Sequence, residues 1–175
     1  MTVRSSSHRR EVLNQLLNFF WTILCFAPVL WFWMKEGVSL YFYMFIAISL
    51  IIGILPDKML NMFTLSLDTR FYHKLGVKKI RKLVQNGDVV NMAASKQRHS
   101  LINGVAQARR YLKTIAMYER FHWGCFTFFL LTAIFCFAFG HLKLGFLIIA
   151  ANLIYNASSI LLQQYNKIRI RKFTG

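Results

Sequence analysis

Long runs of apolar residues alternate with polar stretches along this chain. The runs cover Leu16–Met34, Val38–Leu55, Phe121–Gly140 and Leu142–Leu162. A helix needs about 20 mostly apolar residues to cross the hydrocarbon core of a bilayer, so each run predicts a membrane-spanning helix, with the second at the short end. The connections at 35–37 and 140–141 leave room only for tight turns. Each pair of neighbouring runs is therefore expected to form an antiparallel hairpin.

The pattern predicts an all-α integral membrane protein with a single membrane domain, residues 1–175, and four transmembrane helices in two hairpins. Residues 56–120 lie between the hairpins and are expected to form a basic, amphipathic helical insert, with a turn at Asn86-Gly87-Asp88. Apolar residues repeat at helical spacing on both sides of that turn, at Val77, Ile80 and Val84 before it and at Leu101, Val105, Ala108, Leu112 and Ile115 after it. Both segments predict helices that lie at the membrane surface.

Positive charge collects on one side of the apolar runs. The chain has 22 Lys and Arg against 6 Asp and Glu, and among the basic residues only Lys35 and Lys143 lie beside the hairpin turns. Because basic residues near span ends stay on the cytoplasmic side, both termini and the insert are expected in the cytoplasm. The basic face predicts contact with membrane lipids through anionic headgroups, and it does not favour nucleic acid. A cradle for the phosphates of an anionic donor is the alternative.

Two of the apolar runs carry polar side chains at helical spacing. The fourth run has Asn152, Asn156, Ser159, Gln163 and Asn166, and the first has Asn14, Asn18, Thr22 and Cys25. Unpaired amides are costly in hydrocarbon, so both stripes are expected to face the bundle interior. Hydrogen bonds that fix helix packing and a functional polar site both account for such stripes.

The third run begins with Glu119-Arg120-Phe121-His122-Trp123, which places Glu119 and His122 on one helix face at the membrane boundary. A carboxylate beside an imidazole holds its tautomer and raises its basicity, which suits a general base. The alternative for Glu119 is an interfacial salt bridge with Arg120 or with another cation of the insert. His99, on the polar face of the second insert helix, is a second candidate base. No residue spacing indicates a metal site.

Several segments occur in an order that resembles a known family. They are Ile54–Lys58, Lys74–Lys82, Gln97–His99, Glu119–Trp123 and Gln163–Arg169. Between Ile54 and Lys172 the chain resembles the bacterial glycosyl-diaponeurosporenoate acyltransferase family. It departs from the family's terminal Gln-Arg-Tyr-Asn-Arg-Pro-Arg run at Gln164, Lys167 and Ile168.

The resemblance implies transfer of a fatty acyl group from a thioester, acyl-CoA or an acyl-carrier protein, to a hydroxyl of a glycosylated, carotenoid-type lipid. It implies a multi-pass protein of the bacterial inner membrane with no bound cofactor. We assign His122 as the base and Glu119 as its orienting residue, with His99 as the second choice. Substrate binding is assigned to Asp57, Lys58, Arg98, Arg110, Asn156, Gln163, Tyr165, Asn166 and Arg169.

The rival hypothesis is a non-enzymatic small membrane scaffold or a subunit of a larger complex. In that case the polar stripes would serve packing between chains. Assembly into a homo-oligomer is left open by both hypotheses.

Overall fold

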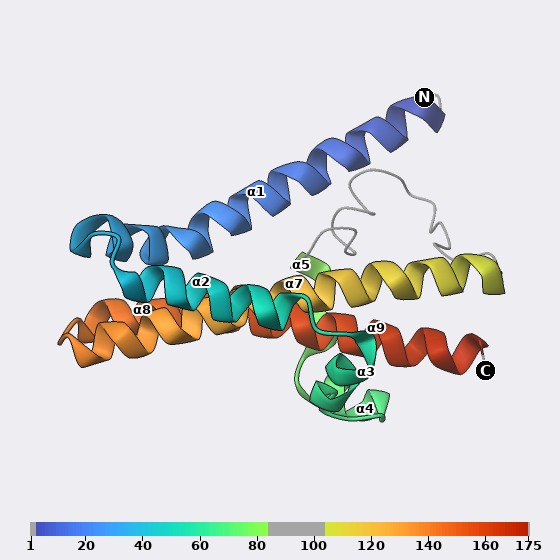
Figure 1. Cartoon of the computed structure of the whole chain (residues 1–175). Coiled ribbons are helices and arrows are strands. Elements are labelled where there is room, and N and C mark those ends of the chain that lie inside the picture. The colour runs from blue at the N-terminus through green and yellow to red at the C-terminus, as the bar shows by residue number, and fades with distance from the viewer. Residues whose placement is uncertain (1–2, 84–103, 175) are drawn as a thin grey trace.

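The computed structural model describes residues 3–83 and 104–174, and these ranges contain helices and no strand (Figure 1). Helices α7, α8 and α9 run along one another, α1 meets them near its C-terminal end and diverges toward its N-terminus, and the short helices α3 and α4 project from one side of the bundle. The elements in chain order are α1 (Val3–Glu36), α2 (Leu40–Gly53), α3 (Asp57–Leu60), η1 (Asn61–Phe63), α4 (Thr69–Lys74), α5 (Val77–Leu83), α7 (Val105–Ala138), α8 (Leu142–Asn152), η2 (Leu153–Ala157) and α9 (Ser158–Thr174).

Within the described ranges, three stretches of helix are long and apolar enough to cross a membrane: Glu11–Glu36, Val105–Ala138 and Leu142–Lys172. The expected second span is shorter. Helix α2 has 14 residues, which gives a length of about 21 Å, less than the roughly 30 Å of a hydrocarbon core. The chain then bends by 94° into α3 and η1. The described chain therefore has three candidate spans, or four if this bent pair counts as one.

Glycines end the two long helices that lead into tight turns. Gly37 after α1 has φ +82° and Gly140 after α7 has φ +79°, a conformation that costs glycine little because it has no Cβ. At the second turn the His141 amide donates to the Cys136 carbonyl oxygen at 2.8 Å, as in a Schellman motif. His141 Nε2 then lies 3.1 Å from Glu36 Oε1. The two turns therefore meet at the same end of the bundle (Figure 1).

The main apolar core lies between α1, α7 and α8. The Trp33 indole nitrogen donates to Thr132 Oγ1 at 3.2 Å, which satisfies a buried N–H in the middle of the aromatic packing. Helix α2 approaches α7 closely at Gly124, where a Cβ would lie 3.0 Å from the Ser49 carbonyl oxygen. The buried core side chains are Cys25, Val29, Phe32, Trp33, Phe129, Ala133, Cys136, Ile148 and Ala151.

The second amphipathic segment of the insert does not form a separate helix at the membrane surface, so that part of the expectation is wrong. From Val105 onward it is the beginning of α7, which continues into the apolar run because no proline interrupts it. Ala108 and Ile115 are buried against Ile170 of α9, so the apolar stripe packs on another helix. The first segment forms α5, and its Val77 is also buried against α9.

Candidate functional site

His122 on α7 faces a hydrogen-bonded chain of amides that crosses to the fourth apolar run. Its Nδ1 lies 3.2 Å from Asn156 Oδ1. Asn156 Nδ2 donates to Asn152 Oδ1 at 2.9 Å, and Asn152 Nδ2 donates to the Phe126 carbonyl oxygen at 3.0 Å. We call His122, Asn156 and Asn152 the amide ladder. Both asparagines are buried, which confirms the interior position expected for these two members of the stripe.

The donor and acceptor of each hydrogen bond in the ladder are fixed, because the ladder ends on the backbone carbonyl oxygen of Phe126. That oxygen can only accept, so Asn152 must present its NH2 group there and its Oδ1 to Asn156. Asn156 then donates through its own NH2 group and presents Oδ1 to His122. Nδ1 of His122 must therefore carry the proton. Nε2 is left with a lone pair and, among the described residues, with no hydrogen-bond partner.

Tyr155 braces the imidazole from a second side and links it to α1. The two rings pack edge to face with their centroids 5.4 Å apart, and the Tyr155 hydroxyl lies 3.0 Å from Thr22 Oγ1. The polar stripe of the first run thus reaches the site through Thr22, and Asn14 is buried as expected. The same expectation was wrong for Asn18, which is exposed on the outer face of α1.

Glu119 contacts other residues than the expected histidine. Its carboxylate is fully buried and lies 2.6 Å from Lys167 Nζ through Oε2, while Oε1 accepts from Gln164 Nε2 at 3.0 Å. We call Glu119, Lys167 and Gln164 the carboxylate cluster. A buried carboxylate needs a cation and hydrogen-bond donors, and α9 supplies both. The contact expected from the Glu119–His122 spacing is replaced by this pairing, and His122 is held by Asn156 instead.

The carboxylate cluster also fixes the chain after α3. Gln164 Nε2 donates to the Phe63 carbonyl oxygen at 3.0 Å, and Gln164 Oε1 accepts from the Leu65 amide at 3.1 Å. The Tyr72 hydroxyl lies 3.1 Å from the same oxygen, and burial raises the pKa of this phenol, so it stays neutral. One glutamine side chain therefore joins α7, α9 and the segment from η1 to α4.

Gln164 and Lys167 were not among the polar residues expected to face the interior, and the turn η2 explains why. Residues Leu153–Ala157 form a π-helical turn, which holds one residue more than an α-helical turn. One extra residue rotates the following positions by about 100° around the helix axis. The interior face therefore moves from the expected Ser159, Gln163 and Asn166, which are half-buried, to Ile160, Gln164 and Lys167, which are buried.

The expected binding residues Asp57 and Lys58 lie at the start of α3. Asp57 forms an ion pair with Arg120, and Arg120 Nε donates to the Leu55 carbonyl oxygen at 2.9 Å. Because the pair is partly exposed, it contributes little to stability, but it attaches the bend after α2 to α7. Lys58 is exposed beside it.

The expected binding residues of α9 lie near the carboxylate cluster. The buried Tyr165 places its hydroxyl 3.0 Å from His73 Nε2, and the exposed Arg169 places its guanidinium 5.3 Å from the centroid of the Tyr165 ring, within the range of a cation–π contact. Gln163 and Asn166 are half-buried on the neighbouring face. None of these side chains is a member of the amide ladder.

The remaining expected residues belong to the insert. Arg110 is exposed near the beginning of α7. Arg98, His99 and Leu101, as well as the turn at residues 86–88, lie outside the described residues.

A family model described as CrtO: Glycosyl-4,4'-diaponeurosporenoate acyltransferase matches residues 56–175. The matched range begins just before α3 and includes α7, α8, η2 and α9. Both the amide ladder and the carboxylate cluster lie inside it, whereas α1 and α2 precede it. No curated protein and no solved structure matches the chain significantly.

Proposed function

The chain belongs to the glycosyl-4,4'-diaponeurosporenoate acyltransferase family, and on this basis we propose that it moves a fatty acyl group from a thioester to a hydroxyl of a glycosylated, carotenoid-type lipid. The hydroxyl oxygen bonds to the acyl carbon, the carbon–sulfur bond breaks, and the hydroxyl proton ends on the released thiol. Acyl-CoA or an acyl-carrier protein serves as the co-substrate. The reaction is expected at the cytoplasmic leaflet of the bacterial inner membrane.

The single observation that best supports this proposal is the direction of the amide ladder. A base must offer a lone pair to the attacking hydroxyl, and the ladder leaves that lone pair on His122 Nε2. As the proton arrives, Asn156 Oδ1 continues to accept from Nδ1–H and stabilises the imidazolium. The asparagine of Cys–His–Asn catalytic sites has a comparable position. The imidazolium then returns the proton to the thiolate that leaves.

We give Glu119 a positioning role in place of the orienting role expected from its spacing. Its bonds to Lys167 and Gln164 support this, because they hold α9 and the segment after α3 against α7. His99 stays the second candidate for the base.

The polar and basic residues around the cluster are proposed to bind the two substrates. Lys58, Arg110 and Arg169 are exposed cations that suit the phosphates of the donor, and Arg98 is assigned with them. Asn156 already uses Oδ1 and Nδ2 within the ladder. Sugar and oxyanion contacts are therefore expected from the half-buried Gln163 and Asn166, together with Tyr165 and Asp57 at the edges of the site.

The proposal is tested with the purified protein in lipid nanodiscs, supplied with an acyl thioester and a glycosylated carotenoid acceptor. His122→Gln should lower turnover by roughly 100- to 10,000-fold, the usual loss when a general base is removed. The matched control is His141→Gln, because His141 lies at the other end of the bundle and contacts Glu36. Near-normal turnover of His122→Gln, with His99→Gln inactive, would transfer the role to His99. If the wild-type protein transferred no acyl group from any donor tested, the result would favour the scaffold hypothesis.

The role of Asn156 is tested by a pair of truncations in the turn η2. Asn156→Ala removes the acceptor for Nδ1–H, whereas Ile154→Ala shortens an exposed side chain of the same turn. Loss of one such hydrogen bond costs about 1–3 kcal/mol, so Asn156→Ala should lower kcat by roughly 10- to 100-fold at a nearly unchanged KM. Equal kcat values for the two variants would remove Asn156 from the mechanism.

A further inference from the structure

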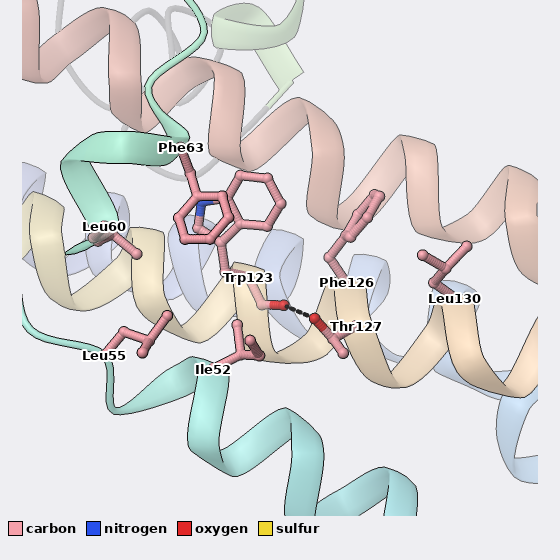
Figure 2. Close-up of a pocket in the computed structure, with 8 residues that line it drawn as sticks. All are labelled: Ile52, Leu55, Leu60, Phe63, Trp123, Phe126, Thr127 and Leu130. Atoms are coloured by element: carbon pink, nitrogen blue, oxygen red, sulfur yellow. Dashed lines mark hydrogen bonds between the residues drawn. The ribbon is translucent and has the colours of Figure 1, made fainter.

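An apolar pocket lies between α2, the α3–η1 segment and α7 (Figure 2). Its lining includes Phe126, whose carbonyl oxygen ends the amide ladder. The volume of the pocket is about 140 Å³. The α7 wall consists of Trp123, Phe126, Thr127 and Leu130, whose spacing places them on one helix face. Thr127 Oγ1 already donates to the Trp123 carbonyl oxygen at 3.0 Å. This wall therefore offers a ligand an almost entirely apolar surface.

One polar atom of the pocket wall is unsatisfied. The indole nitrogen of Trp123 is buried and has no hydrogen-bond partner among the described residues. It lies at the end of the pocket near Phe63 (Figure 2), whose ring centroid is 5.4 Å from that of the indole. Buried donors are nearly always paired, as the Trp33 indole is with Thr132. The Trp123 N–H is therefore a candidate donor to a ligand at this end of the pocket.

The α7 wall of the pocket runs along a candidate membrane span. From Trp123 to Leu130 the helix rises by roughly 10 Å, along a helix that is itself a candidate span. An engineered apolar cavity of about 150 Å³ holds one benzene molecule, so this pocket accommodates a segment of a flexible alkyl chain. A sugar would leave its hydroxyls unpaired here, and a rigid conjugated polyene is too long and straight to enter beyond its tip.

We propose that this pocket binds the carbonyl end of the transferred acyl chain, with Trp123 Nε1 donating to the carbonyl oxygen of the thioester. The inference rests on the proposed function. A fatty acyl thioester carries one acceptor at its head followed by an apolar chain. This matches a pocket with one unpaired donor at one end and an apolar lining. Trp123 directly follows His122 on α7, so the pocket and the proposed base lie at the same level along that helix. Bulk phospholipid, which has a similar ester, is the competing occupant.

The first experiment measures acyl-chain selectivity. Leu130→Phe fills the end of the pocket farthest from Phe63, and Ile134→Phe, on an exposed position one turn further along α7, is the matched control. With a mixture of donors of increasing chain length, the products of Leu130→Phe should shift to shorter chains, with kcat/KM falling roughly tenfold for each methylene that no longer fits. Ile134→Phe should keep the wild-type distribution. An unchanged distribution in an active Leu130→Phe enzyme overturns the inference and leaves the proposed function standing.

The second experiment does not need turnover, so it separates failure of the pocket from failure of the proposed function. An acyl thioester with a photoactivatable group near its carbonyl is crosslinked to the protein in nanodiscs, and the labelled residues are identified by mass spectrometry. Labelling should concentrate on Leu60 and Phe63, which line the pocket at the Trp123 end, and Trp123→Phe, which keeps a ring but removes the N–H, should lower it several-fold. Labelling of the exposed Phe121 and Ile134 to the same extent, or labelling that Trp123→Phe leaves unchanged, would show that the thioester only partitions into the bilayer, and would overturn the inference.

Discussion

Replacing Lys167 with methionine leaves the Glu119 carboxylate buried without its cation. Glu119 is 0% exposed and Lys167 4%, and their charged atoms are 2.6 Å apart. Gln164 still donates to the other carboxylate oxygen, but a neutral amide does not replace a charge. Removal of one partner from a buried ion pair costs about 3–5 kcal/mol. We expect the free energy of unfolding of Lys167→Met to fall by this amount.

The matched variant is Glu119→Gln/Lys167→Met, in which both charges are removed together. Exchange of a whole buried pair for well-packed apolar side chains of similar volume is often neutral or stabilising. In the double variant methionine is such a side chain, and the amide at position 119 keeps an oxygen that accepts from Gln164, so the free energy of unfolding should lie within about 1 kcal/mol of the wild-type value. Glu119→Gln alone leaves the ammonium uncompensated and should be destabilised in the same way as Lys167→Met. The cycle of these variants isolates the energy of the pair. If Glu119 acts only in positioning, the double variant should also retain turnover.

The native thiols provide the assay. Cys25 and Cys136 are free and buried, so their alkylation by a maleimide in mild detergent reports the unfolded fraction as denaturant is added. If the free energy of unfolding of Lys167→Met lay within about 1 kcal/mol of the wild-type value, the reasoning would be refuted. A double variant no more stable than Lys167→Met would refute it as well, because the loss would then come from packing and not from an unpaired charge.

Two further predictions concern topology and helix packing. A cysteine at Val38, in the turn after α1, should react with a membrane-impermeant maleimide outside intact cells, and one at Lys82 on α5 should be protected; the opposite labelling would reverse the orientation. Gly124→Ala places a methyl group 3.0 Å from the Ser49 carbonyl oxygen, so α2 must shift and stability should fall by about 1–3 kcal/mol in the same thiol assay. Gly104→Ala, with open space around the new methyl group, is the control and should change stability little; equal stability of the two variants would show that α2 is free to move.

Much of the helix placement could be predicted, because a long apolar run predicts a membrane-spanning helix and the breaks between runs predict where the helices end. The fourth run became the continuous α8–η2–α9 helix, and Asn152 and Asn156 turned inward because amides in hydrocarbon have to be paired. Pro56 marked the end of the second run, since the residue before a proline disfavours the helical conformation. The family resemblance likewise led to the region that the family model matches.

The partners of Glu119 could not be predicted from spacing alone. A uniform helix after Asn156 would carry Gln163 inward, and the choice of Gln164 depends on a single widened turn. Which turn widens is decided by contacts between helices, such as the bonds of Asn156, and not by local propensity. Sequence separation also hid the pair itself: Lys167 and Glu119 meet only because α7 and α9 are antiparallel neighbours.

The carboxylate cluster has a consequence for how this chain enters a membrane. Glu119 precedes the apolar part of α7, Lys167 follows the apolar part of the α8–η2–α9 helix, and α7 begins where α9 ends (Figure 1). A hairpin inserted with its Gly140 turn leading therefore carries neither of these two charges through the hydrocarbon. Carboxylate and ammonium arrive together at the trailing end, where water is still within reach, and lose their hydration only as the two helices close on each other. The ion pair is therefore expected to form after the hairpin has inserted and to hold α7 and α9 together from then on.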